Sequence, residues 1–259
     1  MGITLTYLGA IVILPLIALA LRPWELGVSG VFHALTTPRV AAALKLSFGL
    51  SALAALLNAP LGLLLAWTLT RYQFPGRRIL DALVDLPFAL PTAVAGIALT
   101  AIYAPTGPLG GLLAKVGIKA AYSPLGIFIA LVFVGMPFVV RSMQPVLQDL
   151  DREVEEAAQT LGANAIQRAV QVILPTLAPS LVSGVSLAFA RAVGEYGSIV
   201  FISANKPFST EIAPYLIVYR LEDYDVLGAT AVAAVLLVIS FVILIGINHL
   251  EAWSNRFTR

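Results

Sequence analysis

Two ionisable residues lie inside an otherwise apolar stretch of the chain. Arg191 and Glu195 are both within the run from Leu177 to Ala204. Their four-residue spacing places them on one face of a helix, where they can form an ion pair. A charge at the centre of a bilayer costs on the order of 3 kcal/mol, so both should face the protein interior. Two roles stay open: a structural pair that locks this helix to its neighbours, or a positive Arg191 along an anion path, with Glu195 holding its rotamer.

The residue types of most enzyme sites are missing. The chain has no cysteine, which excludes disulfides, thiolate metal sites and cysteine nucleophiles. Its two histidines, His33 and His249, are far apart and lack metal-ligand spacing. There is no GxxxxGK[ST] phosphate loop, so the chain cannot hydrolyse ATP by that route. Scattered basic residues and a net charge of +2 give no nucleic-acid footprint. We expect no catalytic residue, no metal and no cofactor on this chain.

The elements that must position these residues are apolar helices. The chain is 59% hydrophobic and 12% charged, with a mean hydropathy of +0.92. A membrane-spanning helix needs roughly 20 apolar residues, and the alternating pattern of barrel strands is absent. The sequence therefore predicts an all-α polytopic membrane protein, a single domain over residues 1–259, with the first run retained as a helix. Six apolar runs are the predicted spans: Ile3–Leu21, Ala42–Leu69, Ala82–Ala104, Pro124–Val146, Leu177–Ala204 and Val226–His249.

A long polar segment, residues 147–176, separates the fourth and fifth runs. Acidic residues from Asp149 onward favour a helix start, because they lie at the positive end of the helix dipole. Gly162 is placed to end this helix in a left-handed conformation, and Asn164 can cap a second helix. Pro175 should prevent the second helix from continuing straight. Each helix carries an apolar stripe: Val154, Ala157, Ala158 and Leu161 in the first, and Ile166, Ala169, Val170 and Ile173 in the second.

Two short helices joined at a glycine corner make a rigid projection that suits a groove on a soluble partner. An interfacial hairpin lying on the membrane is the alternative. The spacing resembles the cytoplasmic coupling loop of bacterial ABC-importer permeases, which reads E-A-A, three residues, G, nine residues, I-x-L-P. Here Val172 replaces the isoleucine. The resemblance implies that seven residues couple the chain to an ATPase: Glu155, Glu156, Ala157, Ala158, Leu161, Gly162 and Pro175.

Orientation does not follow from charge. Eight basic residues would lie on one side of the membrane and seven on the other, which decides nothing under the positive-inside rule. The resemblance of residues 147–176 to a cytoplasmic loop places both termini in the cytoplasm instead.

The fifth run carries a second resemblance. Ala190–Gly197 is similar to the A-R-A-x-G-E-[FY]-G signature of oxyanion permeases, which import sulfate, thiosulfate, molybdate or tungstate. The stretches 85–96, 199–205 and 210–214 resemble the T-type subunit of sulfate/thiosulfate permeases more closely. The resemblance places five residues at the translocation path or a subunit interface: Pro91, Arg191, Gly194, Glu195 and Tyr196.

This resemblance implies a type I ABC-importer permease fold with six transmembrane helices in the bacterial cytoplasmic (inner) membrane. It also implies sulfate or thiosulfate import by alternating access. The partners would be two ATPase subunits that bind ATP and Mg, a W-type second permease, a periplasmic sulfate-binding protein and membrane lipid. Two alternatives remain: a molybdate or tungstate ABC permease and, in a different class, an ATP-independent secondary anion transporter.

Two further patterns leave their roles open. Small residues recur every four positions along the fifth run, as Gly184, Ala188 and Ala192, which favours close helix packing either within the chain or at a subunit interface. Between the fifth and sixth runs, a helical stripe could contact a binding protein or pack on the membrane surface: Ile212, Tyr215, Leu216 and Tyr219.

Overall fold

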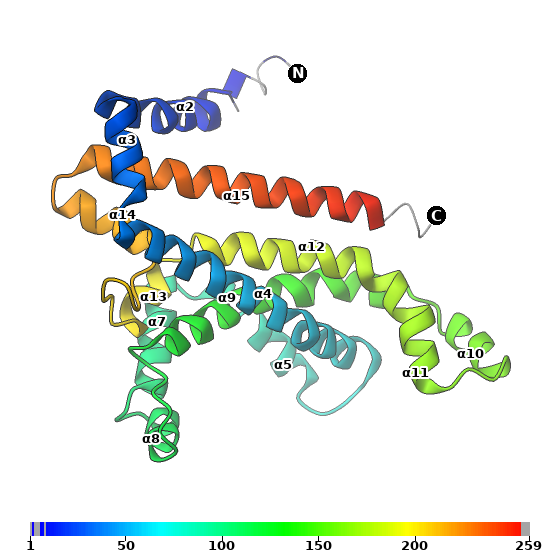
Figure 1. The fold of residues 1–259 in the computed structure, drawn as a ribbon. Helices are drawn as coiled ribbons and strands as arrows, with labels where there is room; N and C mark the ends of the chain where they lie inside the picture. The colour runs from blue at the N-terminus through cyan, green and yellow to red at the C-terminus, as the bar shows by residue number, and fades with distance from the viewer. Residues whose placement is uncertain (1, 3–5, 8, 255–259) are drawn as a thin grey trace.

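The computed structural model describes residues 2, 6, 7 and 9–254, and this part of the chain is helical without strands. Figure 1 shows a group of long helices with a short helical projection at one end. In chain order the elements are η1 (Gly9–Ile13), α2 (Leu14–Leu21), η2 (Arg22–Leu26), α3 (Gly27–Thr36), α4 (Pro38–Arg71), α5 (Arg77–Val84), α6 (Leu86–Ala89), α7 (Thr92–Tyr103), α8 (Pro108–Lys115), α9 (Pro124–Asp149), α10 (Arg152–Thr160), α11 (Ala165–Arg168), η3 (Ala169–Ile173), α12 (Leu174–Val193), α13 (Gly197–Ile202), α14 (Ala213–Glu222) and α15 (Val226–Ser254).

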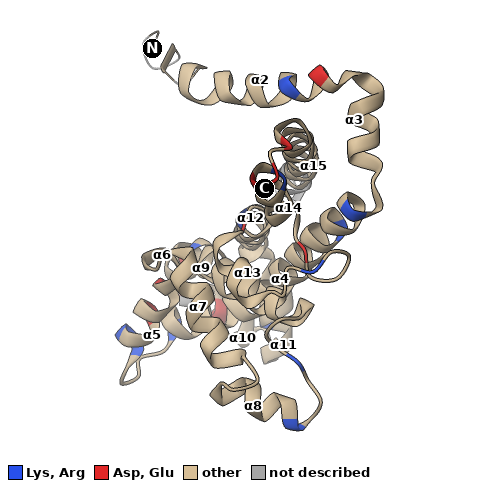
Figure 2. Cartoon of the chain, turned by 90° about the vertical axis from the view of Figure 1, so that its left-hand side faces the viewer, with Lys and Arg blue, Asp and Glu red and all other residues tan. Residues whose placement is uncertain are grey.

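Several helices are long and apolar enough to cross a membrane. In the described part of the chain there are five, or six if α7 and α8, bent by 44°, count as one span. The five are residues 9–36, 38–71, 124–149, 165–193 and 226–247. This confirms a polytopic helical protein. Charged side chains lie mainly near helix ends and in the connections, while long stretches of the helices carry none (Figure 2).

Two of the predicted runs are not single helices. The run Ala82–Ala104 is interrupted at Leu90 and Pro91, whose backbones are extended. The proline lacks an N–H and disfavours helical geometry in the residue before it, so the helix restarts at Thr92. The run Leu177–Ala204 is interrupted between Val193 and Gly197, where Glu195 lies. Each of these two predicted spans is therefore divided between separate helices.

The core is formed by α4, α9 and α12, which pack along one another. Small residues allow the close approach. A Cβ added at Gly184 of α12 would lie 3.0 Å from the Cα of Val139 on α9, and one at Gly62 of α4 would lie 2.6 Å from a Val139 methyl. Ala188 and Ala192 are buried. The small-residue stripe of the fifth run therefore packs within the chain.

The first helical segment stands apart from this core. In Figure 1, α2 lies away from α4, α9 and α12, and among the long helices it packs against α15. None of the residues of η1 and α2 is buried. The connection between the first two predicted spans is itself helical, since η2 and α3 extend the helical segment to Thr36.

Candidate coupling and translocation sites

The polar segment folds into the expected pair of short helices. α10 ends at Thr160, and Gly162 follows with φ of 90°, a left-handed geometry that favours glycine. Asn164 caps α11: its Oδ1 accepts from the N–H of Gln167 at 2.9 Å, and its N–H donates to the Gln167 side chain at 2.8 Å. These local bonds fix the angle between the two helices.

The second helix joins α12 without a gap. α11 continues through the π-helical turn η3 into α12, and Pro175 lies in the first turn of α12. Figure 1 shows a sharp bend between α11 and α12. Pro175 thus does not end the helix, but the chain changes direction where a π-helical turn precedes a proline, a common cause of kinks.

Part of each apolar stripe of this projection is exposed, although Ile173 packs against the core. Leu161 is 89% exposed and Ile166 is 75% exposed, which are high values for large apolar side chains. Glu156 and Ala157 are also exposed, whereas Ala158 is half-buried. We call the exposed apolar surface of Val154, Ala157, Leu161, Ile166 and Val170 the docking face. Large exposed apolar side chains gathered on one projection are typical of a binding surface.

Unlike the exposed Glu156, Glu155 forms an ion pair within the chain. Its side chain is 24% exposed and its Oε1 accepts from Arg71 Nη2 at 2.9 Å. Arg71 is the last residue of α4, 84 positions earlier in the chain. The resemblance assigned Glu155 to the ATPase-coupling loop; its carboxylate pairs with Arg71 of the same chain, and its part in coupling stays a prediction. Arg71 was missed because a long-range pairing leaves no local signal in one sequence.

Arg191 and Glu195 form the expected i, i+4 ion pair, joining Nη1 to Oε2 at 2.5 Å. Glu195 is 1% exposed, and its Oε1 accepts from both the backbone N–H and the hydroxyl of Ser198, each at 2.8 Å. The carboxylate therefore holds the break between α12 and α13. The side chain of Arg191 remains 35% exposed, so part of its guanidinium is available to another group.

The other residues assigned to the path surround this break. Gly194 is exposed, and no described atom outside its immediate neighbours lies within 4 Å of a Cβ built on it. Tyr196 stacks on Tyr215 of α14, with ring centroids 6.5 Å apart. Pro91 lies at the start of α7, which packs against α13 so closely that a Cβ on Gly96 would lie 2.4 Å from the carbonyl oxygen of Ser198.

A second charged cluster was not identified from the sequence. Arg141 of α9 donates from Nε to Asp85 at 2.8 Å and from Nη1 to Asp81 at 2.7 Å, and Gln144 donates to Asp81 at 3.1 Å. Burial of Asp81 acts to raise its pKa, but the hydrogen bonds from Arg141 and Gln144 outweigh that effect, so its pKa is lowered. The cluster connects α5 and α6 to α9.

The opposite end of the molecule is held by a buried pair. Glu211, with 1% of its side chain exposed, accepts two hydrogen bonds from Arg39, at 2.8 and 2.6 Å. The guanidinium carbon of Arg39 lies 4.5 Å from the centre of the Tyr219 ring. Ile212 and Leu216 are buried in the chain itself. Half of the stripe predicted between the fifth and sixth runs therefore packs inside this chain, whereas Tyr219 is 39% exposed.

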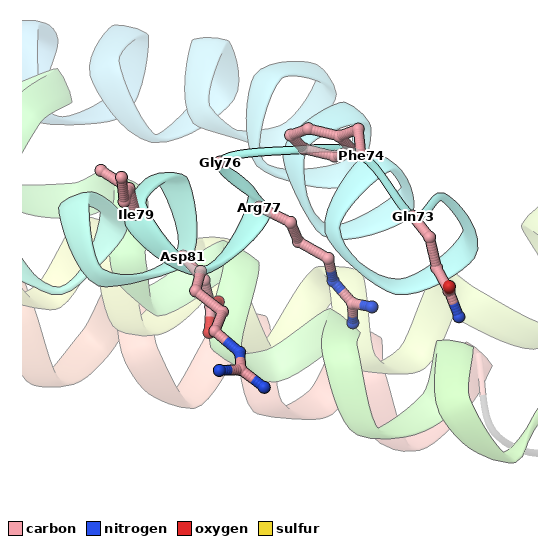
Figure 3. Close-up of a pocket in the computed structure, with 7 residues that line it drawn as sticks. Gln73, Phe74, Gly76, Arg77, Ile79 and Asp81 are labelled. Carbon is pink, nitrogen blue, oxygen red and sulfur yellow. The ribbon is translucent and has the colours of Figure 1, made fainter.

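The turn between α4 and α5 encloses a pocket of about 670 Å³. Figure 3 shows Gln73 and Arg77 extending to the same side of this turn. The pocket is lined by Gln73, Phe74, Gly76, Arg77, Arg78, Ile79 and Asp81. With one carboxylate and two arginines, it has neither the ligands for a metal nor an acid–base pair beside a nucleophile. Within the described residues, no group of three or more His, Cys, Asp or Glu could hold a metal ion.

Comparison with known sequences gives a consistent result. Residues 58–255 match the model of the family described as "Binding-protein-dependent transport system inner membrane component". The chain is 48% identical over 256 residues to the probable sulfate transport system permease protein cysT of Nephroselmis olivacea, covering 99% of this chain and 90% of the relative. It is 45% identical over 259 residues to the sulfate transport system permease protein CysT of Escherichia coli (strain K12), covering 100% and 92%.

Solved structures share the fold. A bacterial alginate ABC transporter, in complex with an alginate-bound periplasmic protein, aligns with a TM-score of 0.76 at 20% identity over 99% of this chain and 92% of that one. The MetNI methionine ABC transporter, in an inward-facing conformation, aligns with a TM-score of 0.62 at 17% identity, over 83% and 94%. The family match over residues 58–255 and the identities of 44–48% over nearly the whole chain lead to one conclusion: the chain belongs to the binding-protein-dependent transport system inner membrane components, the permease subunits of ABC transporters.

Proposed function

We propose that this chain is the T-type permease subunit of an ATP-driven importer of sulfate or thiosulfate. The observation that carries the proposal is the combination of near-full-length similarity to sulfate permeases with a rigid loop whose large apolar side chains face outward. A permease needs no active site of its own, since the energy of ATP hydrolysis arrives from another subunit. The chain itself forms one transmembrane domain over residues 1–259.

The docking face is the surface that an ATPase subunit would cover. Burial of Leu161 and Ile166 would each contribute about 1.5–3 kcal/mol if they became fully buried. The capping box at Asn164 and the left-handed Gly162 keep α10 and α11 in a fixed relation, so a force on one is transmitted to the other. Glu156, which is exposed, lies where it can pair with a basic residue of the ATPase.

The assembled importer would contain two ATPase subunits, which bind ATP and Mg, a W-type second permease and a periplasmic sulfate-binding protein. The location would be the bacterial cytoplasmic (inner) membrane, with six spans, the loop 147–176 and both termini in the cytoplasm. α15 ends on the same side of the molecule as α10 and α11, which supports this orientation (Figure 1). Alternating access would come from rocking of the two permeases about their shared interface.

Arg191 would supply positive potential along the anion path. Its guanidinium is held by Glu195, which is itself fixed by Ser198, and the Arg191 side chain remains 35% exposed. An arginine with spare donors attracts a tetrahedral dianion by charge-assisted hydrogen bonds. Because Glu195 offsets the charge, the attraction would be weak enough for the anion to pass on.

Reconstituted transport tests this function. The chain would be placed in proteoliposomes with its second permease, ATPase and binding protein, and radiolabelled sulfate uptake would be measured with competition by thiosulfate and by molybdate. We expect uptake that requires ATP and is reduced by thiosulfate. Stronger competition by molybdate would favour the molybdate or tungstate alternative. Equal uptake without the ATPase would favour a secondary anion transporter and contradict the proposal.

Variants of the docking face separate coupling from transport. Leu161→Asp should abolish co-purification of the ATPase, because a charge would replace an apolar side chain in the interface. Leu221→Asp is a matched control, since Leu221 is also an exposed leucine, 47% exposed, but lies on α14 at the other end of the molecule. If Leu161→Asp retains the ATPase as well as the control does, the docking face is wrongly assigned.

A further inference from the structure

Arg71 connects three parts of the chain at the cytoplasmic end. It is the last residue of α4, and its Nη2 donates to Glu155 Oε1 on α10 at 2.9 Å and to the carbonyl oxygen of Leu150 at 3.0 Å. Leu150 directly follows α9, so this second bond satisfies a carbonyl that has no partner within the helix. One guanidinium nitrogen therefore links the ends of α4 and α9 to the start of the projection.

The link is shielded from solvent and fixed in place. The side chain of Arg71 is 12% exposed, and its guanidinium carbon lies 5.4 Å from the centre of the Trp67 ring, one turn earlier on α4. Leu69, which is 1% exposed, belongs to the same cluster as Met143 and Leu147 of α9. Arg71 thus extends from the best-packed part of the molecule.

α10 has few other lateral supports. It packs against α11 and η3, which follow it in the chain, and is otherwise joined to α9 through Leu150 and Asp151. A cavity of about 270 Å³ separates it from α4, lined by Trp67, Arg71, Tyr72, Glu155, Glu156, Gln159 and Arg168. Across this space, Arg71 and Glu155 form an ion pair that joins α4 to α10.

We propose that Arg71 is a positioning residue for energy coupling: it makes α10 move together with α4 and α9, so that displacement of the docking face reaches the membrane-spanning core. This inference rests on the proposed function, because it requires an ATPase at the docking face. Without the link, α10 could tilt into the adjacent cavity and absorb the displacement. Glu155 holds the loop to its own subunit through this link.

The test uses the complete transporter in proteoliposomes and measures ATP hydrolysed per anion imported. Arg71→Gln and Glu155→Gln should retain the ATPase on purification but raise this ratio about fivefold or more, the lower end of usual coupling between sites. Arg71→Lys should recover part of the coupling, since both bonds come from one nitrogen and an ammonium can donate both. Arg78→Gln is the matched control, an exposed arginine at the start of α5.

Three results would overturn the inference: an unchanged ratio in Arg71→Gln, no difference between Arg71→Lys and Arg71→Gln, or loss of the ATPase from Arg71→Gln, which would make the residue part of docking alone. Failure of the proposed function would look different. In that case the unmodified transporter would import without ATP or would not retain an ATPase at all.

Discussion

Replacing Glu195 should lower the thermal stability of the chain by a measurable amount. Glu195→Ala removes the acceptor for the N–H and hydroxyl of Ser198 and leaves Arg191 without its partner. Removing one member of a buried pair costs about 3–5 kcal/mol, and the 35% exposure of Arg191 favours the lower end of that range. At about 2–4 °C per kcal/mol for a chain of this size, a loss of about 3 kcal/mol should lower the Tm by about 6–12 °C.

Thermal unfolding of the purified chain in detergent checks this value. Glu195→Gln keeps an oxygen for Ser198 but loses the charge that pairs with Arg191, so its Tm should fall between those of the wild type and Glu195→Ala. Glu222→Gln, at an exposed position, should change stability by less than about 0.5 kcal/mol. If Glu195→Ala unfolds within 2 °C of the wild type, roughly the effect of less than 1 kcal/mol, the carboxylate does not hold the break between α12 and α13.

Three other perturbations test separate parts of the structure. Gly96→Val should lower the free energy of unfolding by about 1–3 kcal/mol, because its Cβ would lie 2.4 Å from the carbonyl oxygen of Ser198. A Tm equal to that of the wild type would show that α7 and α13 are not in close contact. Asn164→Ala should cost about 1 kcal/mol at the start of α11, seen as faster amide exchange over residues 165–168 with unchanged exchange in α9. The lowered pKa of Asp81 stabilises the fold at pH values above the ordinary aspartate pKa of 3.8, and that contribution is lost as the pH falls through the lowered value. The Tm difference between wild type and Asp81→Asn should therefore shrink below pH 3.8, and a difference that grew there would contradict the sign.

The sequence predicted the local features of the loop well. Gly162, Asn164 and the two stripes depend on interactions within about four residues, so their roles follow from backbone geometry and helical spacing. The Arg191–Glu195 pair was found for the same reason. Composition was enough to identify spanning helices, because the bilayer requires both length and apolarity.

Two kinds of feature were not predicted. The breaks within residues 82–104 and 177–204 arise locally, from Pro91 and from the Glu195–Ser198 bonds, but the mean hydropathy of a run does not show them. The long-range pairings depend on tertiary structure. The links from Arg71 to Glu155 and from Arg141 to Asp81 join residues 84 and 60 positions apart, and one sequence does not show such pairings. The roles assigned to Pro91, Gly194 and Tyr196 at the path stay predictions.

The central claim is that an ATPase covers the docking face, and site-directed cross-linking tests it most directly. The chain contains no cysteine, so one thiol can be introduced without removing others. Leu161→Cys should cross-link to the ATPase in membranes containing the whole transporter, with a yield that changes when ATP is added. Tyr224→Cys, which is 92% exposed in the α14–α15 connection, should not. Cross-linking of the ATPase to residue 224 but not to residue 161 would contradict the account.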